Sequence, residues 1–432
     1  MLDLQSLGDL GIFDQLHPDR ALFKLIDHTR TDNGMERLKA RLKQPISDRE
    51  TLLKTQEAIR YLQANIQQFN LPVANDDMYY LERYLESNIV PVNVHNKVKR
   101  TMQIVSRQLT DKSNYFYITS SAKRAAYFMF SLQQFLTTVI KPEVPDVLKR
   151  LLDQMDDTIN MFGLQSLKLD DEVSETSMFV FDHAFRATYK KQVSEFLEIL
   201  YELDALCSLA KFSHRYNLVF PEITEDKFEL KGLYHLQVRH AIPNDIDFNE
   251  AHCLFLTGAN MTGKSTLIRA ICLSVYFAHL GIGVPAAAAR IPLFADIVIA
   301  INKTDDLQRG YSHFMSEIKR VKLAVEKVNE GRKVFAVFDE LFSGTNTEDA
   351  AACLSIVLNG MAKRRNGFFV FTSHLAAILD ELPHMQHVQR RYLEVLHEGE
   401  EIICTYKLKE GVARDRIGLY TLRKEGLEEL LK

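Results

Sequence analysis

Residues 252–270 read HCLFLTGANMTGKSTLIRA, and this stretch decides the fold of the chain around it. Its apolar run at 253–256 is too short for a helix and is followed by Thr257 and Gly258, which predicts a buried strand. The segment GANMTGKS at 258–265 then fits every fixed position of the phosphate-loop pattern G-x-x-x-x-G-K-[ST]. An apolar helical pattern runs from 266 to 278. Strand, glycine loop and helix together predict an α/β domain that binds a nucleoside triphosphate.

The residue types of this loop suit phosphate chemistry. Glycines let successive backbone N–H groups point into one concavity, and the helix that follows adds its positive end. Lys264 is expected to reach the terminal phosphates, and the Ser265 hydroxyl to bind Mg²⁺. The alternative is a glycine turn before a chance Lys-Ser pair, which the flanking strand and helix disfavour. The predicted nucleotide-binding residues of the loop are Gly258, Asn260, Met261, Thr262, Gly263, Lys264, Ser265 and Thr266.

The composition is that of a globular protein. With 432 residues, the chain is long enough for two or three domains. The net charge of −4 gives no whole-chain attraction to nucleic acid or to acidic membranes, so DNA contact would require a local basic surface. Five scattered cysteines without a C-x-x-C pair, no secretion signal and no predicted membrane span lead us to expect a cytoplasmic protein.

Two parts of the chain differ in their patterns. Residues from about 20 to 220 are predicted to be almost wholly helical, with a capping box at Ser47–Glu50 and the longest helix at 190–216. From about 220, short apolar runs alternate with helical patterns. The predicted strands lie at 253–256, 297–301, 334–338 and 368–372. This alternation predicts a mostly parallel sheet with helices on both faces, preceded by an all-α region.

Polar residues follow two of the predicted strands. Asp339 and Glu340 come directly after the apolar run 334–338, as in a Walker B element. Asp339 is expected to hold Mg²⁺, and Glu340 to orient or deprotonate the attacking water. His374 follows the run 368–371 at a strand end where a polar group can sense the γ-phosphate, although a single histidine is as readily structural. The predicted catalytic residues are Glu340, His374 and Lys264, and the predicted metal ligands are Ser265 and Asp339.

A guanine-reading motif is also present in letters, at Asn302-Lys-Thr-Asp305. In GTPases this motif follows the Mg²⁺-binding aspartate, whereas here it precedes Asp339. The residues after Asp339 also lack the glycine of D-x-x-G. We therefore reject the guanine reading and expect ATP and Mg²⁺ as the nucleotide and the metal.

These motifs resemble the MutS family of DNA mismatch-repair ATPases. The loop TGANMTGKST is similar to the family's TGPNMxGKST, with Ala259 and Thr262 as departures. Further resemblances lie at 306–317, 340–349, 372–374, 406–411 and 417–418. The resemblance implies a homodimer of ATPase domains with ATP at the interface, in which Ser312 approaches the γ-phosphate bound by the partner subunit. It also identifies His374 as the switch histidine.

The resemblance extends upstream to residues 31–58, which are similar to the family's core-domain signature T-x-x-G-x-R-x-L…Q-P-L…R-Q-x-A. It implies a helical core domain at 1–75, a lever region at 76–225 with the clamp reduced or absent, and an ATPase domain at 226–432. Because the resemblance to the core domain begins near residue 20, we do not expect the mismatch-recognition and connector domains in this chain. Phe196-Leu-Glu198 matches the recognition motif Phe-x-Glu in letters, but lies within the long predicted helix and is expected to serve packing.

One departure concerns the base. Where the family places a phenylalanine against adenine, this chain has Ala241, so His240 or Tyr406 is expected to supply the stacking. The leading hypothesis is a dimeric MutS-like ATPase that moves helical levers on DNA without reading mismatches directly. The alternative is a nucleotide-gated protein-interaction module without DNA affinity. Lys97, Lys99, Arg100, Lys123 and Arg124 are candidate phosphate contacts, but such charges are more often a solvated helix face.

Overall fold

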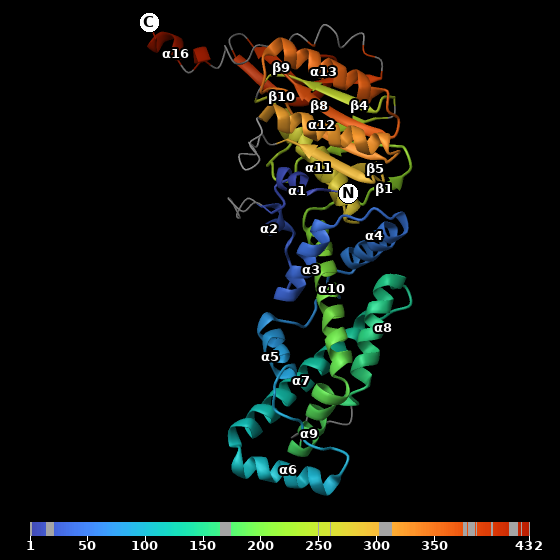
Figure 1. The fold of residues 1–432 in the computed structure, drawn as a ribbon, viewed down its shortest axis with the longest axis vertical. Coiled ribbons are helices and arrows are strands. Elements are labelled where there is room, and N and C mark those ends of the chain that lie inside the picture. Colours follow the sequence, from blue (N-terminus) through green and yellow to red (C-terminus); the bar gives the residue numbers. More distant parts are fainter. Residues whose placement is uncertain are drawn as a thin grey trace. The chain divides into compact units, whose positions relative to one another are not determined.

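A computed structural model describes residues 2–13, 21–164, 174–248, 250–259, 261–301, 313–374, 378, 385, 387–398, 401–413, 422–424 and 426–431. The chain forms two compact units, each built from more than one segment. The first contains Met1–Leu25, Leu42–Gln56 and Arg215–Lys432, and the second contains Ile26–Arg41 and Glu57–His214. The expected fold class is confirmed: a helical N-terminal region precedes a mixed, mostly parallel α/β region (Figure 1). The core, lever and ATPase boundaries at 75 and 225 stay a prediction.

The helices before the sheet follow the sequence pattern closely. Their bounds are α1 Leu4–Asp9, α2 Leu22–Ile26, α3 Asp32–Lys43, α4 Arg49–Ala64, α5 Asn75–Leu85, α6 Lys97–Thr110, α7 Lys112–Val139, α8 Asp146–Asn160, α9 Glu175–His183 and α10 Lys190–Arg215, with a π-helix at Ala184–Thr188. Proline-containing segments, with Pro91 and with Pro142 and Pro145, separate α5 from α6 and α7 from α8. Among the described helices, none is long and apolar enough to cross a membrane.

Two details of the helical region differ from the expectation. The cap of α4 is Asp48, not Ser47, because the Asp48 carboxylate accepts the Thr51 N–H at 2.8 Å. The longest described helix is α7, with 28 residues against 26 for α10. An aspartate and a serine cap equally well, so adjacent candidates cannot be separated by sequence alone.

The phosphate-loop region is organised around a six-stranded sheet in the order β10-β9-β4-β8-β7-β6. Its strands are β4 Cys253–Thr257, β6 Asp296–Ala300, β7 Val334–Phe338, β8 Gly367–Ser373, β9 Val388–Glu398 and β10 Glu401–Glu410. All neighbouring pairs are parallel except β9–β10. A second sheet, in the order β1-β5-β2-β3, is formed by β1 Glu222–Thr224, β2 Glu229–Leu233, β3 Asn244–Asp247 and β5 Ala288–Pro292.

Alternate side chains of the parallel strands pack into two hydrophobic cores, one on each face of the sheet. Val334, Ala336 and Phe338 of β7 belong to a cluster that includes α12 (His313–Asn329) and α13 (Thr347–Ala362). Between them, Phe335 contacts Phe228 and Phe294 in an aromatic cluster. Burial of both faces explains why these strands are continuous apolar runs and not alternating ones. The helix after the phosphate loop is α11, Lys264–His279, and the last described helix is α16, Leu427–Leu430.

The β6 edge of the main sheet is covered by the N-terminal helix α1. Ser6 accepts the Ile299 N–H at 2.9 Å, and Asp9 accepts the Ile301 N–H at 3.0 Å, at the outer side of β6. Arg320 of α12 donates to Ser6 and to the Ile299 carbonyl. These contacts satisfy backbone groups that an edge strand would otherwise expose to pairing with another chain.

Candidate functional site

The phosphate loop lies between β4 and α11, at the carboxyl end of a central strand. Gly258 and Gly263 have φ of 143° and 97°, values that L side chains rarely adopt. A side chain at Gly263 would also be crowded, since its Cβ would lie 3.1 Å from the Tyr406 ring. The bulky Met261 adopts φ 73° and is exposed, so this loop keeps a strained residue at its surface. The loop leads directly into the N-terminus of α11, a position that favours a negatively charged group.

Lys264 lies beneath this loop. Only 4% of the residue is exposed, and its Nζ donates to the carbonyls of Gly258 at 2.6 Å and Ala259 at 2.8 Å. Burial lowers the pKa of Lys264, while the nearby carboxylates of Glu340 and Asp339 oppose that shift. The ammonium is therefore held at the loop by hydrogen bonds that a phosphate oxygen can replace.

A chain of hydrogen bonds joins the ends of three neighbouring elements. Ser265 at the start of α11 donates to Asp339 Oδ2 at 2.8 Å. Thr372 of β8 donates to Asp339 Oδ1, and its Oγ1 accepts the Glu340 N–H at 2.8 Å. Because β4, β8 and β7 are adjacent and parallel, their carboxyl ends meet at this point. The hydroxyl of Ser265 and the carboxylate of Asp339 are the oxygen ligands that Mg²⁺ prefers, and they fit this metal.

Glu340 and His374 meet across the two strand ends. Glu340 has φ 51°, in the left-handed region, and the His374 Nδ1 lies 3.6 Å from the Glu340 Oε1. A non-glycine residue in this conformation is uncommon and strained, and such residues cluster at functional sites. Nearby, Glu317 of α12 accepts the Phe342 N–H at 3.0 Å and lies 3.3 Å from His313. The Glu317 carboxylate therefore holds the segment that follows Glu340.

A cavity of about 600 Å³ opens beside the phosphate loop. Tyr406 and His240 both line it, as expected for the two candidates for base stacking, and Ala241 lies between His240 and Ile242 in its wall. Asn244 fixes Tyr406 in place, since its amide donates to the Tyr406 carbonyl at 3.0 Å and its Oδ1 accepts the Leu408 N–H at 2.7 Å. These bonds span an irregularity in the β9–β10 pairing, where Tyr406 takes φ 57°.

The structure brings most of the predicted site residues together. The cavity is lined by Met261, Thr262, Gly263, Lys264, Ser265, Thr266, His240, Tyr406 and Glu340, while Gly258, Asp339 and His374 are placed by the contacts above. Asn260 and Ser312 lie outside the described residues. Sequence reasoning missed Thr372, which bonds to Asp339 and Glu340, and Glu317, which holds the segment after them. Each stood inside a motif segment, but no pattern showed which backbone group its side chain would bind.

The Phe-x-Glu match and the basic residue Arg124 lie in the helical unit, whereas the Asn302–Asp305 motif lies outside the described residues. Phe196 and Leu197 are buried in α10, and Glu198 pairs with Arg37, as expected for packing. Among the basic candidates, Arg124 pairs with Asp77 at 2.8 Å and stacks over Tyr80 at 4.1 Å. The guanidinium of Arg124 is thus occupied within its own unit.

Comparison with known proteins agrees with this geometry. A sequence model of MutS domain V matches residues 254–430, and one of MutS domain III matches residues 5–210. The chain is 32% identical to the DNA mismatch repair protein MutS of Thermotoga maritima over 246 residues, which are 56% of this chain and 31% of that protein.

Two further relatives carry the same name. The MutS proteins of Staphylococcus haemolyticus and Lactococcus lactis are 30% and 27% identical to this chain, over 59% and 62% of it. The matched region spans about a third of the length of these relatives, 30% and 34%. Because the two domain models together match most of the sequence, and the relatives agree, this chain belongs to the MutS family.

Proposed function

We propose that this chain binds ATP with Mg²⁺ at the phosphate loop and hydrolyses it. The observation that carries the proposal is the bonded series Ser265–Asp339–Thr372–Glu340. It holds two candidate Mg²⁺ ligands and a candidate base near the buried Lys264. MutS domain V is the ATPase domain of the family, which supports the same activity.

Each side chain has a distinct part in this proposal. Lys264 neutralises and orients the terminal phosphates, and its place under the loop brings its charge to the phosphate oxygens. Ser265 and Asp339 hold Mg²⁺, which when bound draws charge from the phosphate oxygens. Glu340 orients the attacking water and accepts its proton, while His374 beside it reports the state of the γ-phosphate. Tyr406 or His240 stacks on the adenine.

We further propose that two copies close over the bound ATP and that this closure moves the helical region on DNA. Ser312 is then the residue that approaches the γ-phosphate of the partner subunit. The family membership supports this proposal, since its relatives bear the name of DNA mismatch repair proteins.

The alternative is a nucleotide-gated protein-interaction module without DNA affinity. The net charge of −4 and the internal pairing of Arg124 favour it. Binding to branched, mismatched and plain duplexes across a range of salt concentrations separates the two. Phosphate contacts must weaken as salt rises, because counterions are released on binding. Absence of binding to every duplex at low salt, with ATP present, would favour the module.

Two substitutions test the catalytic assignment. Glu340→Gln is expected to bind a fluorescent ATP analogue normally and to lower kcat at least about a hundredfold, since it removes the proton acceptor and keeps the shape. Lys264→Ala is expected to lose nucleotide binding itself. Glu326→Gln on the exposed face of α12 is the matched control and should leave both measurements unchanged. Full turnover by the Glu340 variant would reject its role.

A further inference from the structure

The helix α6 presents its apolar side to solvent. Val98, Met102, Val105 and Leu109 are 69%, 69%, 45% and 72% exposed, whereas Ile104 is the only residue of the helix that is buried. We call these four residues the α6 apolar face. Their spacing of four, three and four residues places them on one stripe of the helix. An ordinary surface helix turns such a stripe inward, and contiguous exposed apolar residues mark interaction sites.

The inner side of α6 is attached to its unit largely through polar contacts. Arg107 donates to the Val90 carbonyl, and the Gln103 side chain accepts the Asn93 N–H at 2.8 Å. The helix is also capped, because Asn96 accepts the Lys99 N–H at 3.0 Å. The outward direction of the stripe is thus fixed by specific bonds between α6 and the segment before it.

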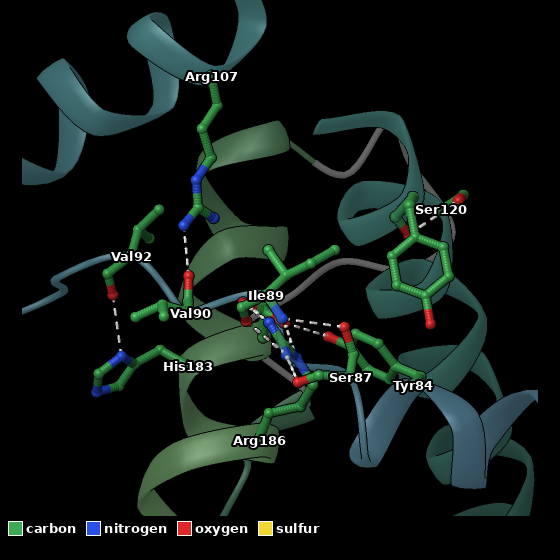
Figure 2. Close-up of polar contacts among 11 residues, drawn as sticks. Tyr84, Ser87, Ile89, Val90, Val92, Arg107, Ser120, His183 and Arg186 are labelled. Atoms are coloured by element: carbon green, nitrogen blue, oxygen red, sulfur yellow. Dashed lines mark hydrogen bonds and ion pairs between the residues drawn. The ribbon is translucent and has the colours of Figure 1, made fainter. Parts of the chain in front are cut away.

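That segment is in turn held by side chains of α9 and of the π-helix, as Figure 2 shows. Arg186 of the π-helix donates to the carbonyls of Ser87 at 3.1 Å and Ile89 at 2.8 Å, and His183 contacts the Val92 carbonyl at 2.9 Å. Arg186 is paired with Asp182, which also accepts the Tyr84 hydroxyl at 2.8 Å. A buried, fully bonded ion pair gives a rigid base to the segment that carries α6.

The charge of α6 selects the kind of partner. The helix contains Lys97, Lys99, Arg100 and Arg107 and no acidic residue. Lys97 and Lys99 are exposed and lie on opposite sides of the stripe, where they can pair with acids that flank an apolar seam. A second α6 would bring no acid to this face. The stripe consists of four residues spread over residues 98–109, a narrow seam of the kind along which two helices pair. It carries no aromatic residue of the kind that anchors helices in lipid.

We propose that the α6 apolar face is a docking site for an acidic amphipathic helix of a partner protein. The partner would place apolar residues at heptad spacing over the α6 apolar face and carboxylates beside Lys97 and Lys99. This mode is the pairing of two amphipathic helices along one seam. The site is independent of the nucleotide chemistry, and its test needs no ATP.

The test measures binding of two fluorescent peptides to the full chain without nucleotide. Both peptides have three heptads with leucine at a and d, one with glutamate and the other with lysine at e and g. The acidic peptide is expected to bind, more weakly as salt rises, and the basic peptide is not. Met102→Gln combined with Leu109→Gln should weaken acidic-peptide binding about tenfold or more, since two apolar contacts are lost. Ile356→Gln, which alters an equally exposed residue of α13, should leave binding unchanged.

Both substituted residues are largely exposed, so the thermal unfolding of the variants should match that of the parent chain. Equal binding of the two peptides, no binding of either, or binding unaffected by the double substitution would overturn the proposal. Flotation with phosphatidylglycerol vesicles that depends on Met102 and Leu109 would assign the face to lipid instead. Self-association lost in the double variant would assign it to a second copy.

Discussion

At the scale of single residues, Thr372 fixes both acids of the candidate site. Its hydroxyl donates to Asp339 and accepts the Glu340 N–H, while the residue itself is fully buried in β8. The Glu340 backbone adopts a left-handed conformation that this bond helps to hold. Thr372 acts through its neighbours and is therefore a positioning residue for the proposed reaction.

Thr372→Val removes this hydroxyl while keeping the shape of the side chain. We expect kcat for ATP hydrolysis to fall about tenfold to a hundredfold with little change in ATP affinity, because a lost positioning contact acts on the reacting geometry. Thr372→Ser should restore most of the activity, since it returns the hydroxyl. Equal losses in the Val and Ser variants would contradict the positioning role and indicate a packing defect.

The sequence located most of the candidate site, because a phosphate loop and an acidic strand end are local patterns. Lys264, Ser265 and Asp339 could be assigned from spacing, and their roles stay predictions. Gly34 shows what a local pattern cannot explain. A Cβ there would lie 2.3 Å from the Asp204 carboxylate, which accepts the N–H groups of Arg30 and Thr31 from 170 or more residues away. Contacts of that separation depend on the fold.

At the scale of elements, His279 joins the end of α11 to the turn before β6. Its Nδ1–H donates to the Val275 carbonyl at 2.9 Å, and its Nε2 accepts the Phe294 N–H at 2.9 Å. The bond from Phe294 needs the neutral ring, because a protonated ring has no acceptor for the Phe294 N–H. Burial lowers the pKa of His279 to about 4 from the usual 6.5.

This depressed pKa makes stability depend on pH. Below pH 6.5 the unfolded chain binds a proton at this position while the folded chain does not, so stability falls as pH falls towards 4. We expect His279 to remove about 2 kcal/mol of folding free energy between pH 8 and pH 5. Urea unfolding of the parent chain and of His279→Gln at both pH values measures the difference. Identical pH dependence in the two would contradict the assignment.

Strands buried on both faces were predicted well, whereas the orientation of a surface helix depends on its surroundings and was not predicted. The buried strands β4, β7 and β8 were found within a residue or two, because a short, continuous apolar run between turn residues is typical of a strand buried on both faces. The spacing of Val98, Met102, Val105 and Leu109 gave no sign that α6 turns this stripe outward. Periodicity identifies a stripe, but neighbouring elements decide which way it faces.

At the scale of the whole molecule, the chain matches two domains of its relatives and about a third of their length. The phosphate-loop unit includes Met1–Leu25 and Leu42–Gln56, which come from the helical N-terminal region of the sequence. Sequence patterns could not reveal this exchange of segments, because it depends on contacts such as those of Ser6 and Asp9 with β6.

In the proposed mechanism, two phosphate-loop units close over ATP. Sedimentation velocity of Glu340→Gln, with and without ATP and Mg²⁺, tests it most directly, because this variant is expected to retain the nucleotide without consuming it. Lys264→Ala serves as the control that should not respond. We expect a shift from monomer to dimer, or a marked tightening of the dimer, when ATP and Mg²⁺ are added. A Glu340→Gln chain that binds ATP and remains monomeric at every concentration would contradict it.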